Sequence, residues 1–328
     1  MMELLKKLSL CVAPSGHEKP VRDLILEEIK DYIDDYTIDP LGSLIAHKKG
    51  SGKKIMVSAH MDEIGFMATF VEENGFIRFC SIGGIRPANI LYSKVIFQNG
   101  IIGVIGAEEK TDPAKLKVED MFIDIGASDR DDALSLIEIG DVAGYYTKFA
   151  LMGGRVTSKS MDDRVACYIA IETLKNIKDC PNDLYFVFST QEEVGLRGAK
   201  GAAFSVDPDM GIALDVTKTG DTPESNKMAV KLGEGAAIKI KDGTILCHRD
   251  VVDLLKSIAL RENIKWQPEI LLAGGTDAGA IHISRSGVPS GGISIPCRYI
   301  HSEAETVSMS DVVECTKLLT AVVTEKFS

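Results

Sequence analysis

The chain has 328 residues, of which 45% are hydrophobic and 26% charged, as is usual for a folded globular protein of one large or two smaller domains. Its formal net charge of −11 argues against nucleic acid or an anionic membrane surface as the main partner. No apolar run approaches the roughly 18 residues needed to span a membrane, so we expect no membrane partner.

The cysteines and the N-terminus both bear on the cellular compartment. The seven cysteines are irregularly spaced, and none forms a Cys-x-x-Cys pair. This usage favours reduced thiols over a disulfide framework. Residues Met1–Lys7 have the pattern of an amphipathic helix, without the apolar block and cleavage site of a signal peptide. We therefore expect a cytoplasmic protein.

The first part of the chain predicts two helices followed by three strands. One helix ends at about Cys11, and the second runs to about Tyr32 after a capping-box spacing at Ser15–Glu18. Strands are expected at 34–39, 42–47 and 54–59. The last of these is a β-rich apolar run that leads directly into His60 and Asp62.

Between about Gly65 and Gly153 the pattern changes to short β-like runs separated by glycine turns, such as Asn99-Gly100. Only Ser128–Ile137 predicts a helix. The β-like runs lie near 65–72, 75–81, 92–98, 101–106, 120–125 and 142–146. Short strands at this spacing are typical of a small β-barrel or sandwich.

After Gly153 predicted helices and strands alternate. The helices are expected at 162–174, 198–204, 249–262, 277–286 and 310–324, and the strands at 184–190, 210–216, 267–272 and 290–296. Continuous apolar strands between helices favour a largely parallel sheet that is covered on both faces. We therefore predict one α/β domain made of residues 1–65 plus 153–328, interrupted by a β-rich insertion at 66–152.

Several potential metal ligands stand where apolar strands end or a helix begins. They are His60, Asp162, Asp163, Glu192, Glu193, Asp215 and His301. Because functional groups gather beyond the carboxyl ends of parallel strands, we expect these side chains to meet at one rim of the sheet. Each acid alone would more readily be explained as a helix cap or a solvated turn residue. Their combination favours a metal site.

In two of these motifs, backbone geometry allows neighbouring residues to take different roles. Residues two apart on an extended chain point the same way, so Asp62 can accept a hydrogen bond from one nitrogen of His60 while the other binds a metal ion. Neighbouring residues point in different directions. Of Glu192 and Glu193, one can therefore bind metal while the other faces the substrate as general base.

Charge counting favours two metal ions over one. One carboxylate can bridge two divalent cations roughly 3.5–4 Å apart, although the sequence alone does not separate Asp162 from Asp163 in this role. Three carboxylates, counted with Glu193 and Asp215, would offset most of the positive charge, and a bridging hydroxide would balance the rest. Histidine and carboxylate ligands suit zinc, cobalt or manganese.

Four segments that carry these residues resemble motifs of the tetrahedral (TET) aminopeptidases, the glutamyl and leucyl aminopeptidase family that has also been labelled endoglucanase M. They are His60–Gly65, Ser158–Arg164, Gln191–Gly195 and Gly274–Ala278. The resemblance covers essentially the whole chain. It implies a phosphorylase/hydrolase-like α/β fold of the zinc-peptidase type, with a PDZ-like β-barrel insertion that mediates dimerisation. It also implies that dimers assemble into a twelve-subunit tetrahedral particle.

The resemblance further implies a role for each candidate residue. One metal ion would lie on His60, Asp162 and Asp215, and the other on Asp162, Glu193 and His301. Glu192 would be the general base, and Asp62 would orient His60. Asp163 would not bind metal and would follow an unusual cis peptide bond.

These expectations describe a cytoplasmic aminopeptidase that removes N-terminal residues from short peptides with two divalent metal ions. The ions would be zinc or cobalt, with manganese as a further candidate. A bridging hydroxide would attack, with Glu192 as the base. Two alternatives stay open, namely a glycosidase in which two carboxylates work without metal, and a non-catalytic assembly protein of the same fold. The sequence does not indicate the native metal or the preferred N-terminal residue.

A further loop offers backbone groups to a substrate. Gly274, Gly275, Thr276 and Asp277 precede a predicted helix, and amides at such a position can bind a negatively charged group. The same loop could instead pack at the edge of the sheet without touching substrate.

Overall fold

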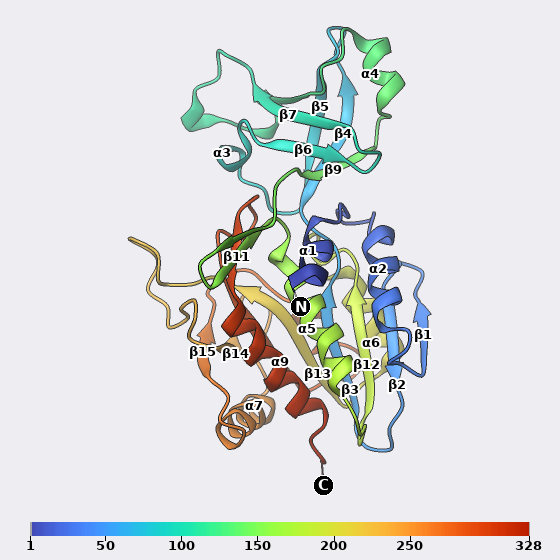
Figure 1. Cartoon of the computed structure of the whole chain (residues 1–328), viewed down its shortest axis with the longest axis vertical. Coiled ribbons are helices and arrows are strands. Elements are labelled where there is room, and N and C mark those ends of the chain that lie inside the picture. Colours follow the sequence, from blue (N-terminus) through green and yellow to red (C-terminus); the bar gives the residue numbers. More distant parts are fainter. Residues whose placement is uncertain (1, 328) are drawn as a thin grey trace.

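The computed structural model describes residues 2–327, so Met1 of the predicted N-terminal helix and Ser328 at the end of the predicted α/β domain lie outside the described residues. Within that range the chain forms a large sheet with helices on both faces and, beyond one end of it, a closed β-barrel (Figure 1). This architecture confirms the predicted α/β fold with a β-barrel inserted into it. Among these residues no helix is both long and apolar enough to cross a membrane.

The helices and strands follow in an order close to the predicted one. Before the barrel the chain forms α1 (Met2–Leu10), α2 (Lys19–Ile29), β1 (Asp35–Ile38), β2 (Leu44–Lys48) and β3 (Lys54–His60). The barrel region contains β4 (Gly65–Val71), β5 (Ile77–Ile82), α3 (Pro87–Ile90), β6 (Lys94–Phe97), β7 (Ile102–Ala107), η1 (Pro113–Lys115), η2 (Val118–Asp120), β8 (Met121–Asp124), α4 (Arg130–Leu136) and β9 (Val142–Tyr145). After it come β10 (Ala150–Met152), β11 (Arg155–Ser158), α5 (Met161–Asn176), β12 (Asp183–Ser189), α6 (Arg197–Val206), β13 (Met210–Thr217), β14 (Ala236–Lys241), α7 (Arg249–Arg261), β15 (Trp266–Ile270), α8 (Ala278–Ile281), β16 (Ser290–Arg298), β17 (Glu305–Ser308) and α9 (Met309–Val323).

The centre of the sheet is parallel and its margins are mostly antiparallel. The main strand order is β1-β2-β12-β3-β13-β16-β17-β11-β10, with β14 and β15 attached beside β16. Strands β12, β3, β13 and β16 run parallel to one another. The pairs of β2 with β12, of β16 with β17 and of β11 with β17 are antiparallel. The sheet is therefore mixed, with the predicted parallel arrangement at its centre.

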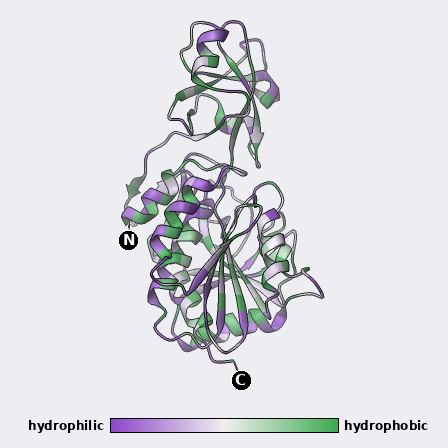
Figure 2. Cartoon of the chain, turned by 90° about the vertical axis from the view of Figure 1, so that its right-hand side faces the viewer, coloured by the Kyte–Doolittle hydropathy of each residue, from purple (hydrophilic) through white to green (hydrophobic). Residues whose placement is uncertain are grey.

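Helices cover both faces of the sheet. Helix α5 packs against β3 and β13 and is flanked by α1, α2 and α9 (Figure 1). On the other side of the sheet, α6 and α8 pack together against β12 and β13. Nearly all side chains of α5 are buried, as expected of a helix enclosed by neighbours. The outer helices mix hydrophilic and hydrophobic residues (Figure 2), as helices with a single buried face do.

The barrel closes in the order β4-β5-β8-β7-β6-β9 and has a core of its own. At its centre the ring of Phe66 packs edge-to-face against Phe79 and Tyr145, with 5.5 Å between ring centroids in both pairs. Its six strands coincide with the six predicted β-like runs. Because closure pairs every edge, a small barrel of short strands can be stable beside the larger sheet.

The helix predicted over 277–286 is wrong in length, because α8 covers only Ala278–Ile281. Two residues with left-handed backbone, Arg285 and Gly287, follow it. The amide of Gly287 donates to the carbonyl of Ser284, which closes a turn where the prediction continued the helix. The residues after the short helix therefore form a largely exposed turn, with Arg285, Ser286 and Gly287 at the surface.

Candidate metal centre

The carboxyl ends of the central strands gather most of the candidate residues at one rim of the sheet. His60 ends β3 and pairs with Ser189 at the end of β12, so that Glu192 and Glu193 follow just beyond. Asp215 lies near the end of the adjacent strand β13. Asp162 comes from the start of α5 and His301 from the connection between β16 and β17.

Two groups of potential ligands result, and they share one residue. The groups are His60, Asp162 and Asp215, and Asp162, Glu193 and His301, and within each group the ligand atoms lie within 4.8 Å of one another. Asp162 stands between the two histidines, with Oδ1 at 3.0 Å from Nε2 of His60 and Oδ2 at 3.5 Å from Nε2 of His301. A carboxylate in this position can serve two cations at once.

Asp163 belongs to neither group. Its Oδ2 accepts a hydrogen bond from the backbone amide of His60 at 3.2 Å, and its side chain is buried. The peptide bond between Asp162 and Asp163 is cis. In this geometry Asp162 is the acid that faces the candidate ligands, and Asp163 supports the end of β3.

Asp62 contacts both His60 and the loop that follows β12. Nδ1 of His60 lies 3.2 Å from the carbonyl oxygen of Asp62 and 3.4 Å from its Oδ1. Both oxygens can only accept, so Nδ1 carries a proton and Nε2 is the nitrogen that would bind a cation. The same carboxylate accepts the backbone amides of Glu192 and Glu193, at 3.0 and 3.2 Å, and the hydroxyl of Ser15 at 2.6 Å.

Glu192 and Glu193 point in different directions. Oε2 of Glu193 lies 3.1 Å from Nε2 of His301, and its Oε1 is buried without a hydrogen-bond partner among the described residues. Glu192 belongs to neither group, and its Oε2 lies 4.0 Å from Nε2 of His60. A buried, unpartnered carboxylate oxygen is costly unless a cation or proton compensates it.

Burial and mutual repulsion perturb the acids of this centre. Burial raises the pKa of Glu192 well above its usual value, and the charge of Asp215 adds to the rise, while His60 opposes it. Burial and Asp162 raise the pKa of Asp215 in the same way. Although burial disfavours its charge, hydrogen bonds to Asp162 and Glu193 raise the pKa of His301 to about 12. So many buried acids around two histidines form a donor set suited to divalent cations.

Glu305 supports the centre but was not foreseen from the sequence. Its Oε2 accepts the backbone amide of Asp162 and its Oε1 that of His301, both at 2.8 Å. Burial, reinforced by the charge of Asp162, raises the pKa of Glu305 to about 8. Glu305 opens the polar strand β17, so no apolar run precedes it to mark the position.

The loop Gly274–Asp277 lies close by, but its side chains face inward. Oδ2 of Asp277 accepts hydrogen bonds from the hydroxyls of Ser58 and Ser189, both at 2.6 Å, and Thr276 is also buried. Gly274 is exposed and Gly275 half-buried. Only the backbone of the two glycines is therefore open to a ligand.

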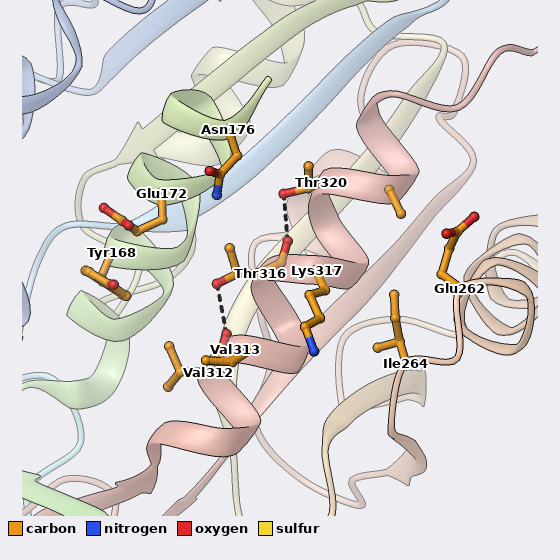
Figure 3. A pocket seen from close by; sticks show the side chains of 11 residues that line it. Tyr168, Glu172, Asn176, Glu262, Ile264, Val312, Val313, Thr316, Lys317 and Thr320 are labelled. Atoms are coloured by element: carbon orange, nitrogen blue, oxygen red, sulfur yellow. Dashed lines mark hydrogen bonds between the residues drawn. The ribbon is translucent and has the colours of Figure 1, made fainter. Parts of the chain in front are cut away.

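A surface pocket of about 520 Å³ lies away from this centre, between α5, α9 and the end of α7 (Figure 3). Valine side chains of α9 and the polar side chains of Glu172, Thr316 and Lys317 line it. None of the candidate ligands belongs to its lining. The hollow is therefore a separate surface feature.

Comparison with known proteins assigns a family. The model of the M42 glutamyl aminopeptidase family matches residues 42–318. A putative aminopeptidase of Acetivibrio thermocellus is 51% identical over 97% of both chains. Two solved structures are also similar. An aminopeptidase of Desulfurococcus kamchatkensis is 38% identical with a TM-score of 0.95 over 98% of this chain and 94% of the other. The TET1 peptidase of Pyrococcus horikoshii, described as able to assemble into a tetrahedron or a large octahedral shell, is 33% identical with a TM-score of 0.90 over 98% and 99%.

Proposed function

The chain belongs to the M42 glutamyl aminopeptidase family and is an aminopeptidase of the TET type, and on this premise we propose that two divalent metal ions serve its reaction on short peptides. The observation that supports the proposal is the pair of ligand groups that share Asp162. A glycosidase without metal would leave His60 and His301 without a role, and the family of peptide hydrolases gives it no support.

The residues fit such ions by number, type and charge. His60, Asp162 and Asp215 would hold one ion, and Asp162, Glu193 and His301 the other. When bound, the ions would polarise the scissile carbonyl and lower the pKa of a water molecule towards neutrality. We propose zinc or cobalt, with manganese as a further candidate, because mixed imidazole and carboxylate ligands suit all three.

Glu192 is the proposed general base. Its carboxylate stands beside both ligand groups without belonging to either. Burial raises its pKa, which makes it a stronger base than a solvated carboxylate, so that it would accept a proton from the attacking water and return it to the leaving amine nitrogen. Asp62 would keep this carboxylate in place through the backbone amide of Glu192, in addition to orienting His60.

The test is the variant Glu192→Gln, which keeps the shape of the side chain but cannot take up a proton. We expect kcat on an aminoacyl chromogenic substrate to fall by about 10²–10⁴-fold. The metal content, measured by atomic emission, should stay unchanged. Glu27→Gln on the exposed face of α2 is the matched control and should keep wild-type activity. Full turnover in Glu192→Gln would rule out this role.

We also propose how substrate and neighbouring subunits are bound. The exposed backbone of Gly274 and Gly275 would contact the peptide, whereas Thr276 and Asp277 would support the loop from within. Residues 1–65 and 153–328 would form the catalytic domain, and the insertion at 66–152 would pair two subunits. Exposed apolar side chains on the barrel region, among them Phe70, Tyr92 and Ile139, support such a contact.

Sedimentation velocity measures the proposed assembly directly. Dimers that combine into a dodecamer predict a particle of about 426 kDa, twelve times the chain mass of 35.5 kDa. Association through the barrel further predicts that Tyr92→Lys shifts the distribution towards smaller species, because a buried lysine would lack a partner. A purely monomeric wild-type protein at micromolar concentration would contradict this part of the proposal.

A further inference from the structure

The barrel reaches the candidate metal centre through the loop between β5 and α3. Nδ1 of His301 lies 2.8 Å from the carbonyl oxygen of Gly84 in this loop. A carbonyl oxygen can only accept, so Nδ1 carries a proton, and Nε2 is the nitrogen that would bind a cation once its own proton is released. That Nε2 faces Glu193 at 3.1 Å and Asp162 at 3.5 Å. One backbone oxygen of the barrel thus holds the ring of a candidate ligand with Nε2 directed at the other two ligands.

The two glycines of this loop pack closely against ligand residues. A Cβ on Gly84 would lie 3.1 Å from Nδ1 and 3.2 Å from Cε1 of His301. Gly83 has a φ of +76°, and a Cβ there would lie 2.7 Å from Ile64 and 3.3 Å from the Cβ of Glu193. The loop backbone therefore lies directly against two of the three ligands of one group.

The other ligand group has its support elsewhere. His60 finds the partner of its Nδ1 in Asp62, two residues further along the same chain segment. His301, by contrast, lies in a loop, and its own φ is +64°. Its side chain is 33% exposed. Its ring therefore has less surrounding packing to hold it, and the contact with Gly84 has more influence on its orientation.

We propose that the β5–α3 loop of the barrel is a positioning element for the metal site of Asp162, Glu193 and His301. The position of the barrel relative to the α/β sheet determines where the carbonyl of Gly84 lies. Through this carbonyl, it sets the affinity of that site for a divalent cation. The site of His60, Asp162 and Asp215 depends on it much less. The inference rests on the proposed two-metal function.

The experiment is a calorimetric titration of chelator-treated protein with Co²⁺ or Zn²⁺. The wild type should show two binding events per chain. Gly84→Ala, which pushes a methyl group against the ring of His301, should weaken one event by about 10–100-fold, the usual effect of disturbing a residue that orients a ligand. The other event should stay within about threefold. Gly154→Ala is the control, because a Cβ there meets no atom within 4 Å.

A second variant assigns the weakened event. His301→Ala should abolish the same event, and adding Gly84→Ala to it should change nothing further, since residues that act through one another are not additive. Gly84→Ala with two wild-type affinities, or with both weakened equally, would overturn the inference while leaving the two-metal function intact. A wild type that binds fewer than two ions would instead remove the proposed function, and this inference with it.

Thermal unfolding of the metal-free variant shows whether Gly84→Ala still folds. If the variant does not fold, histidine nitrogen NMR of the zinc-loaded wild type shows which ring nitrogen of His301 carries the proton. The inference requires His301 to carry its proton on Nδ1, with Nε2 bound to metal. A proton on Nε2, or metal on Nδ1, would contradict it.

Discussion

At the residue scale, Glu305 is the group whose removal tests the support of the centre most specifically. It holds the backbone amides of two candidate ligands, Asp162 and His301, with one oxygen each. We expect Glu305→Ala to lower metal affinity about 10–100-fold, because both ligands lose their anchor. It should also destabilise the fold by about 1–3 kcal/mol, because two amides are left without acceptors.

Its neighbour Glu303 provides the matched comparison, since it is exposed. Metal titration and urea unfolding of Glu303→Ala should agree with the wild type. Unchanged metal affinity in Glu305→Ala would show that the two ligands are held by their surroundings without this carboxylate.

Some residues of the centre can be predicted from the sequence and others cannot, for physical reasons. His60, Glu192 and Asp215 follow apolar strand runs, so their positions at one rim could be predicted. Gly84 contributes only a carbonyl oxygen, which every residue has, and no pattern distinguishes it. The choice of Asp162 over Asp163 depends on backbone direction at the start of α5, which composition and spacing do not encode.

At the scale of elements, a buried ionic cluster joins the end of β3 to α5 and the N-terminal helix. Nζ of Lys159 lies 2.6 Å from Oε2 of Glu63, and Arg164 lies 3.7 Å from its Oε1, all three side chains being buried. Arg164 also donates to the backbone carbonyls of Leu8 and Met61. One anion thus compensates two buried cations that link three elements.

Glu63→Gln should therefore destabilise the protein by about 3–5 kcal/mol, because it leaves Lys159 and Arg164 uncompensated in the interior. Lys159→Met should cost less, since Arg164 still balances Glu63. Urea unfolding of the metal-free proteins measures both. Glu27→Gln, which breaks an exposed pair with Lys30, should change stability by no more than about 0.5 kcal/mol. A loss below about 1 kcal/mol in Glu63→Gln would mean that the cluster is solvated.

The accuracy of the element predictions follows the continuity of the apolar pattern in the sequence. The apolar central strands and the enclosed helix α5 could be predicted because their patterns are continuous. Strand β14 was missed since it contains Lys239 and Lys241, yet Lys239 is buried and paired with Glu269 of β15 at 2.5 Å. Such pairing across strands lies outside the local pattern. The short polar strand β17 was missed for the same reason.

At the scale of the whole molecule, the barrel is both a separately packed unit and a neighbour of the centre. Short strands with glycine turns were enough to predict it, because its core is formed by its own residues. How it sits on the sheet depends on contacts between distant segments, such as Gly84 with His301. The junction of barrel and sheet is therefore where the proposed association and the proposed metal binding would influence each other.

The central claim is that this aminopeptidase works with two metal ions per chain. The most direct measurement is aminopeptidase activity during stepwise addition of Co²⁺ or Zn²⁺ to chelator-treated protein, with bound metal determined in parallel. The two ligand groups around Asp162 predict negligible activity in the metal-free protein and a plateau at two bound ions per chain. Full activity that survives chelation, or a plateau at a single bound ion, would contradict the claim.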